Sequence, residues 1–260
     1  LDQGEYRKAR EYFQESLAIC RAGGDREGET KALGNLGNVA FAQGDWAEAE
    51  TSYRAALKLF RELGDRRGEA IMLNNLGYLV RSAGDFVEAR RLFQDSERLF
   101  AELGDRWGVA AALTNSGWTE HLLGNEEAGE RLLREGLALR RRLGDQRGTV
   151  YSLVRLGLVL LSRGKGGAAE LREALELGLE AGSVSLILDA LSACAVFLSQ
   201  KGKEKEAQRL AACVLSHPNA AWESKGWARA ASGLDESPAP LEATDPVGLA
   251  REALGWLKAG

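Results

Sequence analysis

Residues 64–85 read GDRRGEAIMLNNLGYLVRSAGD, a helix-sized segment that lies between two Gly-Asp pairs. Such pairs recur every 40 residues, in two sets half a period apart. The first set is Gly24-Asp25, Gly64-Asp65, Gly104-Asp105 and Gly144-Asp145, and the second is Gly44-Asp45, Gly84-Asp85, Gly124-Asn125 and Gly164-Lys165. Each half-period of about 20 residues can hold a helix of about 16 residues and a short turn. Repetition at this interval predicts a series of helix pairs.

The residues around these turns carry helix start and stop signals. In Asp45-Trp46-Ala47-Glu48, the Asp side chain can cap the first turn, and the Glu can reach back to the Asp backbone N–H. The preceding glycine suits the left-handed conformation that ends a helix. Between the turns, apolar residues such as Ala49, Tyr53 and Phe60 recur at helical spacing. The pattern therefore predicts alternating helices and turns.

Glycines also recur inside the predicted helices, at Gly37, Gly77, Gly117 and Gly157. Each costs roughly 1 kcal/mol relative to Ala in a helix interior. A cost repeated at one position of every repeat indicates that a side chain does not fit there. We therefore expect a neighbouring helix to approach the backbone closely at these positions.

Composition excludes several classes of protein. The 260 residues are 45% hydrophobic and 28% charged, which argues against wholesale disorder. The sequence has no run of 18 uncharged apolar residues, so we expect no membrane-spanning helix in it. The net charge of −4 gives no reason to expect direct nucleic-acid binding. The three scattered cysteines fit a reduced cytoplasmic protein better than a disulfide scaffold.

The first helix of each pair carries a motif that resembles tetratricopeptide repeats. Leu33-Gly34-Asn35-Leu36-Gly37 is followed by Gly-Asp-aromatic and then by Ala49, Tyr53 and Ala56, and Leu73-Asn74-Asn75-Leu76-Gly77 begins a second copy. The period of 40 instead of 34 is similar to the longer-helix variety found in kinesin light chains and many bacterial signalling proteins. The resemblance implies an all-α, right-handed superhelical solenoid of antiparallel helix pairs. In that family the first helices line a concave groove, where peptides commonly bind.

We divide the chain by this register. The repeat array spans 1–216, with a half repeat at 5–22 followed by pairs at 26–63, 66–103, 106–143, 146–181 and 183–216. Residues 217–260 are expected to form C-terminal capping helices with a loop at about 232–246. The alternative is a partly disordered terminus.

Both ends of the sequence suggest a fragment of a larger protein. The chain begins with Leu1-Asp2, without Met and in the middle of a repeat. His217-Pro218 and Trp222-Glu223 resemble the tail of repeat arrays in bacterial STAND-class ATPases (signal transduction ATPases with numerous domains) and related transcriptional regulators. That resemblance implies a sensor tethered to an upstream nucleotide-binding or DNA-binding domain absent from this sequence.

Few residues suggest chemistry. The chain has no Gly-x-x-x-x-Gly-Lys-Ser/Thr phosphate loop, and neither His121 nor His217 has a partner at metal-ligand spacing. Cys20, Cys194 and Cys213 lie at core positions of the repeat. We therefore expect no enzyme, no cofactor and no metal site.

A stripe along the first helices is the better candidate for binding. Asn35, Asn75 and Asn115 recur every 40 residues, and an Asn amide offers the donor and the acceptor that a peptide backbone needs. Aromatic side chains there suit interface hot spots, and arginines suit carboxylates. The predicted groove residues are Lys31, Asn35, Asn38, Arg67, Asn74, Asn75, Tyr78, Arg81, Trp107, Asn115, Trp118, Arg147, Tyr151 and Arg155.

Structural alternatives exist for each kind of residue. The asparagines could hydrogen-bond between neighbouring helices, the tryptophans could fill gaps between repeats, and the arginines could belong to a solvated face. We favour a non-enzymatic recognition or sensor module that binds a peptide, protein or anionic ligand, with an acidic partner expected. The alternative function is a structural scaffold for self-association or oligomer assembly.

Overall fold

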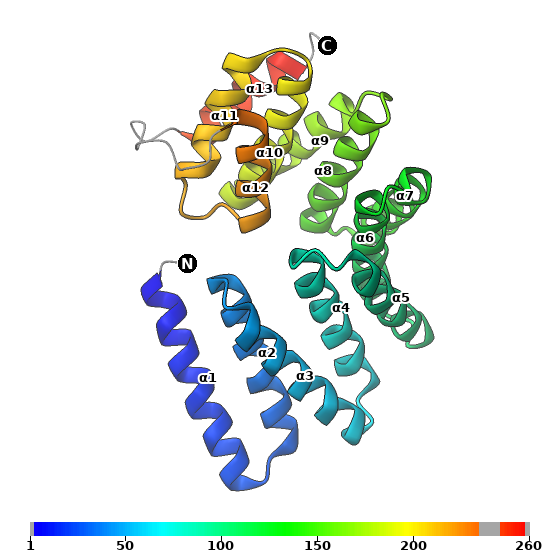
Figure 1. Cartoon of the computed structure of the whole chain (residues 1–260), viewed down its shortest axis with the longest axis vertical. Helices are drawn as coiled ribbons and strands as arrows, with labels where there is room; N and C mark the ends of the chain where they lie inside the picture. Colours follow the sequence, from blue (N-terminus) through cyan, green and yellow to red (C-terminus); the bar gives the residue numbers. More distant parts are fainter. Residues whose placement is uncertain (1–2, 234–244, 258–260) are drawn as a thin grey trace. The chain divides into compact units, whose positions relative to one another are not determined.

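The computed structural model describes residues 3–233 and 245–257, and these residues form thirteen α-helices and no strand (Figure 1). Contacts divide the chain into two compact units, 1–132 and 133–260. Most of the loop expected at 232–246 lies outside the described residues. The predicted fold class, all-α with successive antiparallel helix pairs, is confirmed.

Unit 1 consists of six helices and the start of a seventh. The helices are α1 (Gln3–Gly23), α2 (Arg26–Gln43), α3 (Trp46–Leu63), α4 (Arg66–Ser82), α5 (Phe86–Glu102), α6 (Arg106–Leu122) and α7 (Glu126–Leu143), of which α7 crosses the boundary between the units. Each helix from α1 to α5 packs against the next one in the chain (Figure 1). The first helices also meet one another, since α4 contacts α6.

Aspartates begin the helices as the sequence predicts. The carboxylates of Asp25, Asp65 and Asp105 each accept a hydrogen bond from the backbone N–H three residues later, at 2.8–3.0 Å. This bond satisfies a backbone donor that has no partner inside the helix. At the preceding turn, Gly64 has φ +70°, a left-handed conformation that costs other residues more. The helix boundaries follow from these local interactions.

The recurring glycines mark close contacts between helices, as expected. A Cβ atom on Gly37 would lie 2.5 Å from the ring of Tyr53, and one on Gly77 would lie 2.8 Å from the ring of Phe93. Both glycines are on the first helix of a pair, and both rings are on the second. An aromatic ring thus packs directly on the backbone of its partner helix, and this contact joins α3 to α2 and α5 to α4.

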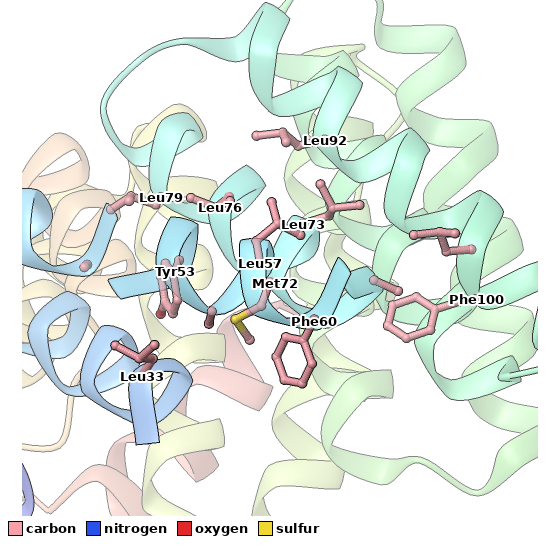
Figure 2. Close-up of a cluster of buried hydrophobic side chains, with 14 of the residues drawn as sticks. Leu33, Tyr53, Leu57, Phe60, Met72, Leu73, Leu76, Leu79, Leu92 and Phe100 are labelled. Atoms are coloured by element: carbon pink, nitrogen blue, oxygen red, sulfur yellow. The ribbon is translucent and has the colours of Figure 1, made fainter. Parts of the chain in front are cut away.

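The core of unit 1 is continuous from one helix pair to the next. Figure 2 shows Leu33, Tyr53, Phe60, Leu73 and other buried side chains in one cluster, which draws on α2, α3, α4 and α5. Phe60 also covers Gly68, at the start of the following pair. Buried apolar surface stabilises the folded state by about 25 cal/mol per Å². Because the cluster spans pairs, no pair buries its apolar surface alone.

Unit 2 contains the rest of α7 and six more helices. These are α8 (Gln146–Ser162), α9 (Ala168–Glu180), α10 (Val184–Gln200), α11 (Glu204–Ser216), α12 (Trp222–Ser232) and α13 (Pro246–Trp256). Helix α10 lies at the centre, with α8, α9, α11, α12 and α13 packed against it. Helices α12 and α13, which follow residue 217, therefore pack on α10.

Candidate functional site

The predicted binding residues lie in both units. Eleven of them are on α2, α4 and α6 of unit 1, and we call the surface of these three helices that carries them the first-helix face. Arg147, Tyr151 and Arg155 are on α8 of unit 2. The environments of the two groups differ, as their exposure and contacts show.

Asparagines connect the first helices to one another. The Asn75 side-chain amide donates to Oδ1 of Asn38 at 3.3 Å, and that of Asn115 donates to Oδ1 of Asn74 at 3.0 Å. Asn38 also accepts a hydrogen bond from the Tyr53 hydroxyl at 2.8 Å. Asn35 is half-buried. Asn75 and Asn115 therefore form hydrogen bonds between neighbouring helices, which was the structural alternative left open by the sequence.

The last turns of α4 and α6 form the buried end of the first-helix face. Arg81 is 5% exposed, with its guanidinium 4.5 Å from the ring centroid of Tyr78 and 5.5 Å from that of Phe93. Trp118 is 6% exposed and lies against His121, with 4.9 Å between ring centroids. Stacking on aromatic rings stabilises a guanidinium that is withdrawn from water. Arg81 and Trp118 are therefore packing residues of the first-helix face, and little of either side chain is exposed.

The first two turns of α2, α4 and α6 form the exposed end. Trp107 is 52% exposed and Ile71 is 37% exposed, so both side chains present apolar area to solvent. Lys31 and Arg67 are also exposed, and the Arg67 side chain retains 68% of its accessible surface. This end combines apolar area with positive charge.

Arg67 is positioned by the N-cap of the neighbouring first helix. Its Nε atom donates to Oδ2 of Asp105 at 2.9 Å. The backbone N–H of Gly108, and then Arg67, hold the pKa of the Asp105 carboxyl below its usual range. The carboxylate therefore stays ionised at neutral pH and holds Arg67 between α4 and α6.

In unit 2, Arg155 is completely buried by its neighbours. It is 0% exposed, and it forms an ion pair with Glu223 of α12 at 2.6 Å. Its guanidinium also lies 3.4 Å from the ring centroid of Tyr151, whose hydroxyl accepts a hydrogen bond from it. Arg147 is exposed on the same helix. The arginine that was predicted to bind a carboxylate of a ligand is thus paired with the Glu223 carboxylate of the chain itself.

A second carboxyl group lies in the same buried cluster. Asp189 of α10 accepts a hydrogen bond from the Ser224 hydroxyl at 2.5 Å. Burial raises the pKa of the Asp189 carboxyl, and Ser224 and Arg155 oppose that shift only in part. Glu223 and Ser224 are adjacent residues of α12, so one turn of this helix meets both α8 and α10. These contacts attach α12 to unit 2.

No pattern in the sequence pointed to Glu223, Ser224 or Asp189 as partners of Arg155. Glu223 is 68 residues from Arg155, and it lies after the last recognisable repeat. The one available signal was that α8 has Arg155 where the preceding first helices have Asn115 and Asn75. That substitution indicated a different environment without naming the group that would fill it.

The other reactive groups of the described chain are its cysteines and its possible metal ligands. Residues 3–233 and 245–257 hold no cluster of three His, Cys, Asp or Glu side chains suited to a metal ion. Cys194 is buried in unit 2, and burial raises the pKa of the Cys213 thiol to about 11. Cys20, expected in the core, is only half-buried. Burial raises the pKa of the Cys194 thiol as well, so Cys194 and Cys213 stay protonated at neutral pH and are poor nucleophiles.

None of the helices in the described ranges has the length and apolar character needed to span a membrane.

Comparison with known proteins agrees with the fold. The family model for the tetratricopeptide repeat matches residues 1–62, 28–102 and 68–142. BtubC (BKLC) from P. vanneervenii has a similar crystal structure, with a TM-score of 0.58, over 92% of this chain and 96% of that chain. At 17% sequence identity this similarity bears on the fold alone. Comparison with curated proteins found no match.

The family matches cover more than half of the sequence, in overlapping windows that follow the 40-residue register. Tetratricopeptide repeats generally mediate protein–protein interaction or scaffolding, and they are typically not enzymes. The first-helix face and the aromatic-on-glycine contacts described above fit such repeats. The chain belongs to the tetratricopeptide repeat family.

Proposed function

We propose that the exposed end of the first-helix face in unit 1 binds a protein or peptide partner that carries acidic side chains. The observation that supports this most is the exposure of Trp107 on α6, together with that of Ile71 and Arg67 on α4 and Lys31 on α2. Tryptophan and arginine are enriched among the residues that dominate binding energy at interfaces. An apolar anchor next to fixed positive charge suits a partner with an apolar residue flanked by carboxylates.

The charges at this end favour an acidic partner. Arg67 uses one edge of its guanidinium on Asp105, and the side chain remains largely exposed. Its remaining N–H groups can therefore donate to a carboxylate of the partner, in the bidentate geometry that arginine favours. Lys31 adds a second positive charge on the neighbouring first helix. The proposed partner is therefore acidic, like the ligand expected from the sequence.

The buried end serves mainly to position the exposed end. Asn115 and Arg81 fix α4 against α6 through the Asn115–Asn74 hydrogen bond and a contact between Arg81 and the Asn115 carbonyl. A rigid support lowers the entropy lost on binding, because the contact residues are already ordered. Asn115 and Trp118 therefore contribute to affinity through the geometry of the face.

For the protein as a whole, we propose a non-enzymatic cytoplasmic sensor within a bacterial signalling protein. Partner binding on the repeats would bias an upstream nucleotide-binding or DNA-binding domain, as the STAND-like tail suggests. A scaffold for self-association is the second candidate. It is favoured by apolar side chains exposed on second helices, such as Val87 at 60%.

Affinity measurements on selected peptides test the proposal. Peptides selected by the full chain from a random library are titrated calorimetrically against the wild type, Trp107→Ala and Arg67→Ala. We expect acidic peptides, with affinity at least about tenfold weaker for Trp107→Ala. Val87→Ala is the matched control, because it removes an exposed apolar side chain from α5, and it should bind like the wild type. Equal affinities for Trp107→Ala and wild type would refute the proposal.

A further inference from the structure

Helix α12 packs on α10 and α11, yet its first turn also reaches α8 (Figure 1). Glu223 of that turn pairs with Arg155 of α8 at 2.6 Å, and Tyr151 lies against the same guanidinium. The ring centroid of Trp227, also on α12, is 5.7 Å from that guanidinium. A charge-assisted hydrogen bond to a buried guanidinium is one of the stronger polar contacts in proteins. Glu223 thus binds Arg155 as the carboxylate of an acidic ligand would.

The rest of α12 is held mainly by small side chains. Among its described side chains, the buried ones are those of Ser224, Ala228 and Ala231, and Trp227 is only half-buried. The preceding helix α11, in contrast, buries large apolar side chains such as Leu210. Hydrophobic stabilisation grows with the apolar area removed from water, so two alanine methyl groups contribute little to it. The polar contacts of the first turn therefore carry a large share of the attachment of α12.

Helix α12 also has little intrinsic stability. It is 11 residues long, and isolated helices of that length are marginal in water. Its N-cap residue, Ala221, makes no side-chain capping bond. Gly226 lies inside the helix, where glycine is unfavourable, and a Cβ atom there would meet open space. Unlike Gly37 and Gly77, Gly226 therefore serves no close contact between helices. Helix α12 depends on its docking to stay helical.

The surface of α8 that meets Glu223 continues along the helix. Arg147, Tyr151 and Arg155 are spaced four residues apart, which places them on one side of α8. Arg147 is exposed, and its charge acts on the buried Asp189 carboxyl of α10. An exposed arginine thus lies about two turns from the filled one. Two arginines with a tyrosine between them suit a ligand that carries more than one carboxylate.

We propose that α12 is an internal acidic ligand that closes a carboxylate-binding site on α8, and that an acidic segment of a partner protein displaces it. The site consists of Arg147, Tyr151 and Arg155, and Glu223 is its occupant in the closed state. Arg147, already exposed, receives the first carboxylate of the partner. A second carboxylate then replaces Glu223, so Arg155 keeps the counter-charge that a buried arginine requires. This inference is independent of the proposed function of the first-helix face.

Covalent connection explains why the site is closed in the free chain. Glu223 belongs to the same chain as Arg155, so its effective concentration beside the guanidinium is high. A single carboxylate in dilute solution therefore competes poorly with it. A segment with several carboxylates gains a second contact at Arg147, and linked contacts bind more tightly than separate ones. The partner segment is therefore a run of acidic residues.

Variants that detach α12 without altering α8 test the proposal. Ser224 is 2% exposed and bonds to Asp189, so Ser224→Glu introduces a larger, acidic side chain where neither its size nor its charge fits. Glu223→Gln is a second opening variant, which removes the carboxylate and keeps the side-chain size. Fluorescently labelled hexaglutamate is titrated into the full chain and followed by anisotropy. We expect both variants to bind it at least about tenfold more tightly than the wild type does.

Two controls separate the site on α8 from other basic surfaces. Ser216→Glu adds the same charge at an exposed position at the end of α11, and it should bind hexaglutamate like the wild type. Labelled hexaglutamine should bind the opened variants at least about tenfold more weakly than hexaglutamate does. Circular dichroism checks that each variant is folded. Equal affinity of hexaglutamate for the wild type and both opening variants, or equal affinity of the two peptides for the opened variants, would overturn the proposal.

Limited proteolysis tests the displacement of α12 in the wild-type chain. Lys225 is a trypsin site within α12, and its cleavage requires local opening of the helix. Saturating hexaglutamate should raise the rate of cleavage after Lys225 at least about threefold, because cleavage follows the population of the open state. Cleavage after Lys58, on α3, should not change. An unchanged rate after Lys225 would show that an acidic ligand does not displace α12, and the proposal would be wrong.

Discussion

Two arginines on equivalent helices, Arg67 in unit 1 and Arg155 in unit 2, have opposite environments. Arg67 forms an ion pair near the start of α4 with 68% of its side chain exposed, whereas the Arg155 side chain is 1% exposed and is paired with Glu223. The same residue type in the same predicted stripe is thus open to a partner in one unit and filled by the chain's own carboxylate in the other. The comparison shows that residue type predicts what a position can bind, while packing decides whether it is available.

The largest expected effect separates these two arginines by stability. Replacing Arg155 with Leu should destabilise unit 2 by about 3–5 kcal/mol, because Glu223 and Asp189 would be left buried without their cation. Replacing Arg67 with Leu should change stability by less than about 1 kcal/mol, since an exposed ion pair contributes little. Urea unfolding followed by circular dichroism measures both. Similar losses for the two variants would mean that the Arg155 cluster is not buried as described.

A smaller effect distinguishes the two asparagine contacts within unit 1. Asn115→Ala should cost about 1 kcal/mol or somewhat more, because Asn115 is buried and its bond to Asn74 is well formed. Asn75→Ala should cost less, since its bond to Asn38 is longer and exposed. Thermal unfolding of the two variants checks the order. A larger loss for Asn75→Ala would contradict this account of the buried end.

The smallest effect is a pH dependence of opposite sign in the two units. Burial lowers the pKa of His121, so the unfolded chain binds more protons and acidification through the region near 6.5 removes stability from unit 1. Burial raises the pKa of Asp189, so the native state binds more protons and rising pH above about 3.9 removes stability from unit 2. Thermal unfolding across pH measures both effects in the wild type and in two variants, His121→Gln and Asp189→Asn.

We expect His121→Gln to lose less stability on acidification than the wild type does. Asp189→Asn should lose less stability as pH rises. Curves parallel to the wild type for both variants would show that these two groups do not titrate with the shifts described.

Sequence reasoning predicted the fold well because the decisive features are local. Helix ends depend on Asp65 and similar caps within four residues, and pair packing depends on Gly37 and Gly77, whose cost inside a helix is visible in the sequence. These features repeat every 40 residues, so each copy supports the others. The interhelical asparagine bonds were among the alternatives that the spacing alone left open.

The availability of the predicted binding residues could not be derived in the same way. Arg81 is buried because rings from α4 and α5 enclose it, and Arg155 is buried because α12 returns from outside the repeats. Helical periodicity assigns a residue to a side of its own helix, but it contains no information about a segment that packs there from 68 residues away. The division between the exposed and buried ends of the first-helix face therefore required the structure.

Photo-crosslinking of a bound peptide locates the partner site on the chain itself. An acidic peptide selected by the full chain is synthesised with a benzophenone side chain, irradiated in complex, and the adducts are mapped by mass spectrometry. We expect adducts on α4 and α6 near Ile71 and Trp107, and their loss in competition with unlabelled peptide. Adducts on α8 near Tyr151, or on the second helices of unit 1, would contradict the assignment of the partner site to the exposed end of the first-helix face.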